Sequence, residues 1–217
     1  MTIRGVLFDF SSTLFRLEFS DPKFPKDEES ARTQRIMLSM TAGPTRPLPV
    51  HDDPDWARRD LDQDTHHRMF TEAFRQAGIP DGHVERAYAQ VLDPVSWTAY
   101  PDAGAALRRL RGAGVPVAVV SNIAWDIRSI FDRAGITDLV AEFVLSYLEG
   151  SMKPDEKLFR VACDRLGVDP AEALMIGDSA QADGGAAAVG CAVEIVPAIP
   201  TWERPDALLA ALAKHGL

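Results

Sequence analysis

The sequence predicts an α/β fold in which a doubly wound parallel sheet carries an inserted α-helical cap. Short apolar runs, rich in β-branched residues, alternate with amphipathic helical stretches over most of the chain. The runs are apolar throughout instead of alternating with polar residues, which is typical of parallel strands buried on both faces. One long segment without strand character interrupts the pattern and indicates the insertion.

The alternating part of the chain gives the order of the elements, and glycine or proline marks several of their ends. Parallel sheets of this kind hold their ligands beyond the carboxyl ends of the strands, so polar residues just after strands are candidates for a site. We expect strands over residues 3–8, 115–120, 143–145, 173–176 and 192–196, and helices over 103–111, 125–134, 154–166, 183–189 and 205–215.

We interpret residues 16–94 as the helical cap domain, and residues 1–15 and 95–217 as a Rossmann-like core domain. The inserted segment is charged and rich in helix formers. An alternative is that its helices pad the sheet instead of covering a site.

Within the insertion, apolar residues recur at helical spacing over 55–76 and 84–92. Prolines predict a loop over 41–50. We expect no strand between residues 15 and 100, because no run there has β character.

Composition narrows the class of protein. The chain has 217 residues, of which 46% are hydrophobic, and its formal net charge of -9 argues against nucleic acid or an anionic membrane as a partner. No run approaches the roughly 20 apolar residues that cross a bilayer, and the chain begins directly with an apolar strand, so we expect a cytoplasmic protein. Cys163 and Cys191 stand among apolar residues and are expected to be buried thiols. The oligomeric state, monomer or homodimer, stays open.

Four segments supply reactive side chains. Asp9 follows the first strand in VLFDFSSTL (6–14), Ser121 and Asn122 follow a later one, Lys153 precedes a proline, and GDSAQAD (177–183) holds Asp178 and Asp183. A strand-end carboxylate is a possible nucleophile, and a second acid could share a hard cation with it. A lysine and a hydroxyl could hold the oxygens of a transferring phosphoryl group.

These motifs, in this order, resemble those of the haloacid dehalogenase-like (HAD) hydrolase superfamily with a helical, C1-type cap. The resemblance covers nearly the whole chain and implies a Mg²⁺-dependent phosphatase or phosphoryl-transfer enzyme acting on a small phosphorylated metabolite. It implies that Asp9 is the nucleophile and that Ser121, with Asn122, and Lys153 bind the transferring group.

The resemblance also implies a metal site. Asp9, the backbone carbonyl of Ser11 and Asp178 would be the Mg²⁺ ligands, and Asp183 would act behind them as a supporting acid or through water. Structural explanations compete with these roles: Ser121 and Asp183 could be caps, and Lys153 a solvated lysine.

Ser11 departs from the family's pattern. Phosphatases of the family carry a second aspartate at this position, which protonates the leaving oxygen and later activates water. Serine cannot do this near neutrality. The chain could be a phosphatase for good leaving groups, an enzyme with a longer-lived Asp9 intermediate, a 2-haloacid dehalogenase that attacks carbon, or a member that binds a phosphorylated ligand without turnover. We favour phosphoryl chemistry, because the two motif acids suit a magnesium site.

Cap residues leave further questions. His66 and His67 could donate protons in place of the missing aspartate, but we expect an exposed pair on a charged helix. A phosphonatase of this family would need a cap lysine that forms a Schiff base with the substrate. Lys23 and Lys26 stand in a polar stretch, so we do not expect either to be desolvated enough for the lowered pKa that this requires. Trp125 is expected to pack or to begin a helix, although it could wall the pocket. The sequence does not identify the substrate or the cap residues that select it.

Overall fold

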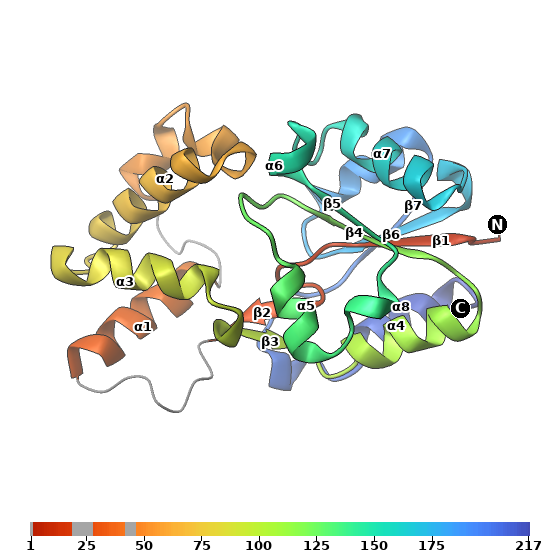
Figure 1. The fold of residues 1–217 in the computed structure, drawn as a ribbon, viewed down its shortest axis with the longest axis horizontal. Helices are drawn as coiled ribbons and strands as arrows, with labels where there is room; N and C mark the ends of the chain where they lie inside the picture. Colours follow the sequence, from red (N-terminus) through yellow and green to blue (C-terminus); the bar gives the residue numbers. More distant parts are fainter. Residues whose placement is uncertain (1, 19–27, 42–46) are drawn as a thin grey trace.

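The computed structural model describes residues 2–18, 28–41 and 47–217, with a helical body beside a larger α/β body (Figure 1). The larger body contains a five-stranded parallel sheet in the order β5-β4-β1-β6-β7. The predicted α/β class is therefore confirmed. The strands are β1 (Gly5–Phe8), β4 (Val117–Ser121), β5 (Glu142–Leu145), β6 (Ala173–Gly177) and β7 (Ala192–Ile195).

Strand β1 lies at the centre of the sheet because it is apolar on both faces. Val6, Leu7 and Phe8 are fully buried, and β1 pairs with β4 on one side and β6 on the other. The chain fills one half of the sheet with β4 and β5 before it crosses to β6 and β7. This change of direction opens a crevice at the carboxyl end of β1, where Asp9 follows Phe8.

Helices cover both faces of the sheet (Figure 1). One apolar cluster joins the face that carries Val6 and Phe8 to residues of α4, α5 and α8, and a second joins the Leu7 face to residues of α7 and the 3-10 helix η6. The helices are α4 (Ala103–Gly112), α5 (Arg128–Ala134), α6 (Ser146–Glu149), α7 (Glu156–Leu166) and α8 (Ala207–Lys214), with 3-10 helices η4 (Thr137–Leu139), η5 (Pro170–Glu172), η6 (Asp183–Val189) and η7 (Thr201–Glu203).

The helical body is the inserted segment. Its apolar side chains, among them Phe74, Val84 and Val91, belong to the same cluster as Phe10 at the end of β1, so the cap packs directly on the core. The domain boundaries at residues 16 and 94 stay a prediction. The cap elements are α1 (Glu28–Thr41), α2 (Gln63–Gln76) and α3 (Asp81–Leu92), with 3-10 helices η1 (Pro49–Asp52), η2 (Trp56–Leu61) and η3 (Pro94–Ser96).

The expectation of no strand between residues 15 and 100 is wrong. β2 (Phe15–Leu17) and β3 (Trp97–Ala99) pair antiparallel where the chain enters and leaves the cap. Each strand has three residues, which is too short for a periodic pattern. They form because the two ends of the insertion meet, and Phe10 packs on both Phe15 and Trp97.

Two predicted helices also differ. The stretch 55–76 breaks at Asp62, whose backbone is extended and whose side chain accepts a hydrogen bond from the Thr65 amide at 2.8 Å. Asp62 therefore caps α2 and separates it from η2. Residues 183–189 form the 3-10 helix η6 instead of an α-helix. This helix lies close to the segment after Lys153, since a Cβ on Gly185 would be 2.7 Å from the Pro154 carbonyl oxygen.

Cys163 and Cys191 are free and buried, as predicted. The proline-rich loop predicted over 41–50 lies partly outside the described residues, and η1 begins within it at Pro49. Helix α5 begins at Arg128, three residues after Trp125. Among the described residues, no helix combines the length and apolar character that a membrane span requires.

Candidate active site

Polar side chains from three strands meet at the carboxyl edge of the sheet. Asp9 follows β1, Ser121 ends β4 and Asp178 follows β6, and all three line one pocket. Asp9 and Ser121 are buried, and Asp178 is partly exposed. Parallel pairing of β1 with both neighbours brings them together, since the strands end at the same edge.

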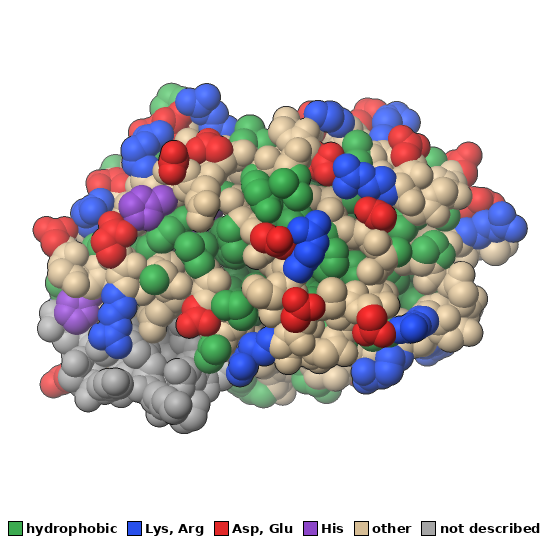
Figure 2. Space-filling model, viewed as in Figure 1, with side chains coloured by type: hydrophobic (Ala, Val, Ile, Leu, Met, Phe, Trp, Pro, Cys, Tyr) green, Lys and Arg blue, Asp and Glu red, His purple; other side chains and the backbone are tan. Residues whose placement is uncertain are grey.

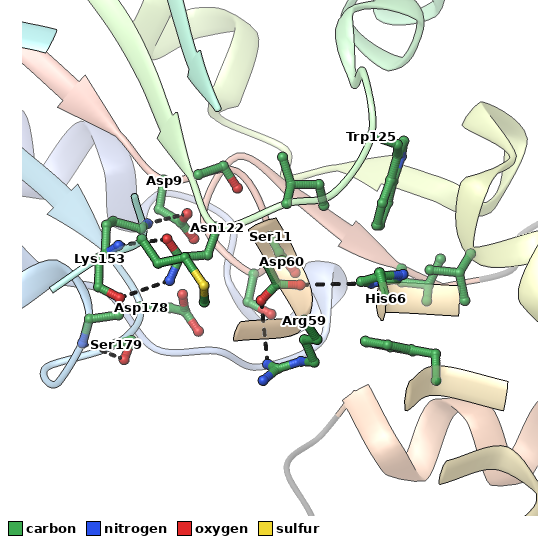
Figure 3. A pocket seen from close by; sticks show the side chains of 18 of the residues that line it. Asp9, Ser11, Arg59, Asp60, His66, Asn122, Trp125, Lys153, Asp178 and Ser179 are labelled. Atoms are coloured by element: carbon green, nitrogen blue, oxygen red, sulfur yellow. Dashed lines mark hydrogen bonds and ion pairs between the residues drawn. The ribbon is translucent and has the colours of Figure 1, made fainter. Parts of the chain in front are cut away.

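Lys153 links two of the acidic residues (Figure 3). Its Nζ atom lies 2.6 Å from Asp9 Oδ1 and 2.6 Å from Asp183 Oδ1, and its side chain is buried. The other oxygen of Asp183 accepts a hydrogen bond from the Ser179 amide at 2.9 Å. Lys153 is therefore not a solvated lysine, and Asp183 holds the lysine in place.

The three aspartates form a compact acidic cluster. Asp9, Asp178 and Asp183 each offer an oxygen, and these oxygens lie within 4.8 Å of one another. Burial, the largest cause, raises the pKa of Asp9 to about 8, while Lys153 opposes the rise and the other two carboxylates add to it. Burial likewise raises the pKa of Asp178.

The charge balance of this cluster favours a cation. Burial acts to lower the pKa of Lys153, but Asp9 and Asp183 together raise it, so the lysine carries a charge. One ammonium group faces three acidic side chains, and the charges of Asp178 and Asp183 help to raise the pKa of Asp9, so a divalent cation, which prefers carboxylate oxygens, would stabilise the charged forms. The donor set therefore fits Mg²⁺. The predicted participation of the Ser11 carbonyl stays a prediction.

Asn122 supports the lysine segment. Its Nδ2 donates to the Lys153 carbonyl at 2.9 Å, and its Oδ1 accepts from the Lys153 amide at 2.7 Å. Both ends of the side chain amide therefore hold the backbone of Lys153. The role in substrate binding that we expected for Asn122 stays a prediction, but the structure gives the side chain a positioning role.

The loop after Asp9 is held by a residue that sequence reasoning missed. Ser12 has a φ of 59°, in the left-handed region that few side chains adopt. Arg204 donates to the carbonyl oxygens of Ser12, at 2.8 Å, and Thr13, and its guanidinium lies 3.2 Å from the centre of the Tyr100 ring. No local motif marks Arg204, because its role depends on the C-terminal segment returning to the β1 loop.

The pocket extends from the acidic cluster into the cap. Its volume is about 870 Å³, and Ser11 lies in its wall. On the face shown in Figure 2, acidic and basic side chains are interspersed, without a large patch of one sign. The cap end is mainly apolar and aromatic, and its walls include Trp56, His66, Phe70, Phe74, Trp97 and Trp125.

Asp60 is an acidic residue in this pocket that the sequence reasoning did not single out. It is buried on η2, next to Arg59, which also lines the pocket. One signal was available: Asp60 stands four residues after Trp56, on the side of the predicted helix that should be apolar. A lone acid at such a position is unusual unless it has a partner or a function.

His66 is not part of an exposed pair. It is 1% exposed, stacks on Phe70 with ring centres 4.1 Å apart, and its Nδ1 lies 2.9 Å from the Tyr88 hydroxyl. Burial lowers the pKa of His66 to about 3, so the ring is neutral near pH 7. His67 is partly exposed and pairs with Glu85 at 2.8 Å.

Two further expectations concern the pocket. Trp125 does not begin a helix; it packs against His66, with ring centres 5.0 Å apart, and it also walls the pocket. Lys23 and Lys26 lie outside the described residues.

The arrangement defines a class of protein: an α/β protein in which a strand-end aspartate, a buried lysine and a cluster of hard oxygen ligands line a pocket beneath a helical body. The family model for haloacid dehalogenase-like hydrolases matches residues 3–190. The chain belongs to this hydrolase family.

Known relatives carry different names. The chain is 34% identical over 128 residues to haloacid dehalogenase-like hydrolase domain-containing protein 3 of Bos taurus, covering 56% of this chain and 51% of the relative. It is 36% identical over 118 residues to phosphoserine phosphatase of Thermus thermophilus, covering 54% of this chain and 47% of the relative. It is 37% identical over 94 residues to (S)-2-haloacid dehalogenase 4A of Burkholderia cepacia, covering 43% of this chain and 41% of the relative. The chain thus spans about half the length of these relatives.

Solved structures share the fold. The crystal structure of a HAD phosphatase from Thermococcus onnurineus matches with a TM-score of 0.58 and 25% identity, covering 89% of this chain and 86% of that one. The match includes most of the chain.

Proposed function

We propose that the protein is a Mg²⁺-dependent phosphatase that acts on a small phosphorylated metabolite through a covalent intermediate at Asp9. The observation that carries the proposal is the buried Lys153, which lies 2.6 Å from both Asp9 and Asp183 while Asp178 completes the acidic cluster. The names of several relatives support phosphoryl chemistry.

Asp9 is the nucleophile in this proposal. A carboxylate oxygen attacks phosphorus, the bond to the leaving oxygen breaks, and an acyl phosphate forms. Lys153 and the Ser121 hydroxyl lie in the same pocket and would hold the phosphoryl oxygens, with their positions set in advance by Asp183 and by the end of β4. Water then cleaves the acyl phosphate and frees Asp9.

Asp9 and Asp178 would hold the magnesium ion, which would neutralise phosphoryl charge when bound. Asp183 already receives a hydrogen bond from Ser179 and an ion pair from Lys153, so it fits the role of a supporting acid. The acidic cluster thereby gains the positive charge that Lys153 alone does not supply.

The second candidate function is 2-haloacid dehalogenation. Ser11 favours it, because a halide leaves as an anion and needs no proton from the enzyme. A dehalogenase is also among the similar proteins. Against it stands the cluster of three carboxylates, because attack on carbon needs no cation and gains nothing from additional negative charge.

The test compares phosphate release from para-nitrophenyl phosphate and acetyl phosphate with and without Mg²⁺, alongside chloride release from 2-chloropropionate in EDTA. We expect Mg²⁺-dependent phosphate release that Asp9→Asn abolishes. Asp164→Asn, an exposed position on α7, is the control and should keep full activity. Chloride release in EDTA, or full phosphatase activity in a folded Asp9→Asn variant, would overturn the proposal.

A third arm measures binding. Mg²⁺ should raise the melting temperature of the wild type, and Asp178→Asn should weaken this effect, since a ligand stabilises the folded state by binding to it. Binding of phosphate with Mg²⁺ without turnover of any substrate would instead support the non-catalytic alternative.

A further inference from the structure

The proposed phosphatase lacks an acidic residue two positions after its nucleophile, and the acids that surround Asp9 are the proposed metal ligands and the partner of Lys153. Ser11 occupies the wall of the pocket two residues after Asp9, and a serine hydroxyl neither donates nor accepts a proton readily near neutrality. An alkyl leaving group nevertheless requires a proton when the bond to phosphorus breaks. A group elsewhere in the pocket has to provide it.

Among the described residues of the cap, Asp60 is the one whose carboxyl group lines this pocket. In Figure 3 it lies between the group formed by Asp9 and Lys153 and the aromatic ring of His66. It is 7% exposed, and one carboxyl oxygen lies 3.6 Å from the Arg59 guanidinium while the other lies 3.8 Å from the neutral His66 ring, both beyond hydrogen-bond distance. The carboxyl oxygens of Asp60 are therefore held loosely and lie in the wall of the pocket.

A residue of the core fixes Asp60 over the site. The hydroxyl of Ser146, at the start of α6, donates to the Asp60 carbonyl oxygen at 2.6 Å and accepts from the Ile123 amide at 2.8 Å. Ile123 follows Ser121 and Asn122 in the loop after β4. The backbone of Asp60 is thus attached to the loop that carries Ser121, although Asp60 belongs to the cap.

The surroundings of Asp60 raise the pKa of its carboxyl group. Burial is the largest influence and raises its pKa, while the charges of Arg59 and Lys153 act in the opposite direction. His66 faces it as a neutral ring, and Tyr88 lies behind His66. Asp60 and Lys153 line the same pocket.

We propose that Asp60 is the general acid and base of this enzyme and replaces from the cap the function that Ser11 cannot perform. The inference rests on the proposed phosphatase function. In the first step Asp9 bonds to phosphorus, the bond from phosphorus to the leaving oxygen breaks, and the Asp60 proton passes to that oxygen, giving an alcohol and the Asp60 carboxylate. In the second step Asp60 takes a proton from water as the water oxygen bonds to phosphorus, and Asp9 leaves as a carboxylate.

The competing explanation is that Asp60 only balances the charge of Arg59 and stabilises the cap. The two roles differ in their dependence on the leaving group. Loss of a general acid harms alkyl phosphates most, because an alkoxide leaves poorly without a proton, and it harms aryl phosphates with acidic phenols least. Loss of a structural ion pair lowers all rates by a similar factor.

The experiment measures kcat/KM for a series of phosphate esters, from para-nitrophenyl phosphate through phenyl phosphate to an alkyl phosphate. We expect Asp60→Asn to lower turnover of the alkyl ester by roughly 10²- to 10⁴-fold and that of the para-nitrophenyl ester by less than about tenfold. Asp60→Glu, which keeps a carboxyl group, should recover part of the loss. Asp64→Asn, an exposed acid on α2, is the matched control.

The outcomes separate the two proposals. A wild type without phosphatase activity would overturn the proposed function. An active wild type in which Asp60→Asn lowers every ester by the same factor, with an unchanged melting temperature, would overturn the role of Asp60. If Asp60→Asn fails to fold, the leaving-group dependence of Asp60→Glu decides: a steeper dependence than in the wild type supports the acid, and an unchanged one contradicts it.

Discussion

The Asp183 carboxylate occupies the space that a side chain on Gly177 would need. A Cβ placed on Gly177 would fall far inside van der Waals contact with Asp183 Oδ2. Gly177 ends β6, so the absence of a side chain there lets the first turn of η6 approach the sheet edge. The position of Lys153 depends on this approach, because Asp183 is one of its two carboxylate partners.

Gly177→Ala should therefore disable the site. The methyl group displaces Asp183, the displacement moves Lys153 relative to Asp9, and we expect kcat to fall by about 10²-fold or more. Overpacking should also lower the free energy of unfolding by about 1–3 kcal/mol. Gly184→Ala is the control, since a Cβ there meets nothing within 4 Å. Steady-state kinetics checks the fall in kcat, and urea unfolding checks the fall in the free energy of unfolding. Equal rates in Gly177→Ala and Gly184→Ala would contradict this role of Gly177.

Asn122→Ala should separate positioning from substrate contact. The variant removes both hydrogen bonds to the Lys153 backbone, which should cost about 1 kcal/mol each in stability. We expect kcat to fall by about tenfold because the lysine is held less firmly, while KM stays close to that of the wild type. A large rise in KM with little change in kcat would show that Asn122 binds substrate directly.

Part of the core site follows from the sequence, because several of its residues stand where predicted parallel strands end. Asp9, Ser121 and Asp178 each stand at the end of an apolar run, and parallel strands end at one edge of the sheet. Local patterns therefore predict a long-range cluster, and the structure brings these residues together with Lys153 and Asp183.

The cap part of the site does not follow from local patterns. Whether Asp60 or His66 faces the pocket depends on how the cap docks, and that is decided by contacts far apart in the chain, such as Ser146 with the Asp60 carbonyl. β2 and β3 are too short to leave a pattern. Arg204 reaches the loop after Asp9 from the opposite end of the sequence.

His66 should make stability depend on pH. Its pKa is 6.5 in the unfolded chain and about 3 in the folded protein, where burial disfavours the charged ring. The unfolded state therefore binds more protons between these values, so the contribution of the neutral ring is complete above 6.5 and is lost as the pH falls toward 3. Between about pH 7.5 and about pH 5 the loss should be about 2 kcal/mol.

Urea unfolding of His66→Gln checks this value. The variant should be less stable than the wild type near pH 7.5, and its stability should fall by about 2 kcal/mol less on acidification to about pH 5. Parallel curves for His66→Gln and the wild type would mean that His66 does not titrate differently on unfolding.

Ser11→Asp tests whether Asp60 already supplies the proton transfer that an acid at position 11 would provide. In the wild-type background the new carboxyl group duplicates an existing function, so we expect alkyl phosphate turnover to rise by less than about threefold. In the Asp60→Asn background the same substitution should raise turnover by roughly 10-fold to 100-fold, because it restores an acid beside the leaving group. Ser11→Asn has a similar size and cannot donate a carboxylic proton, so it should give no gain in either background. Equal gains from Ser11→Asp in both backgrounds would mean that the two positions act independently, and the cap carboxyl group would then have no part in proton transfer.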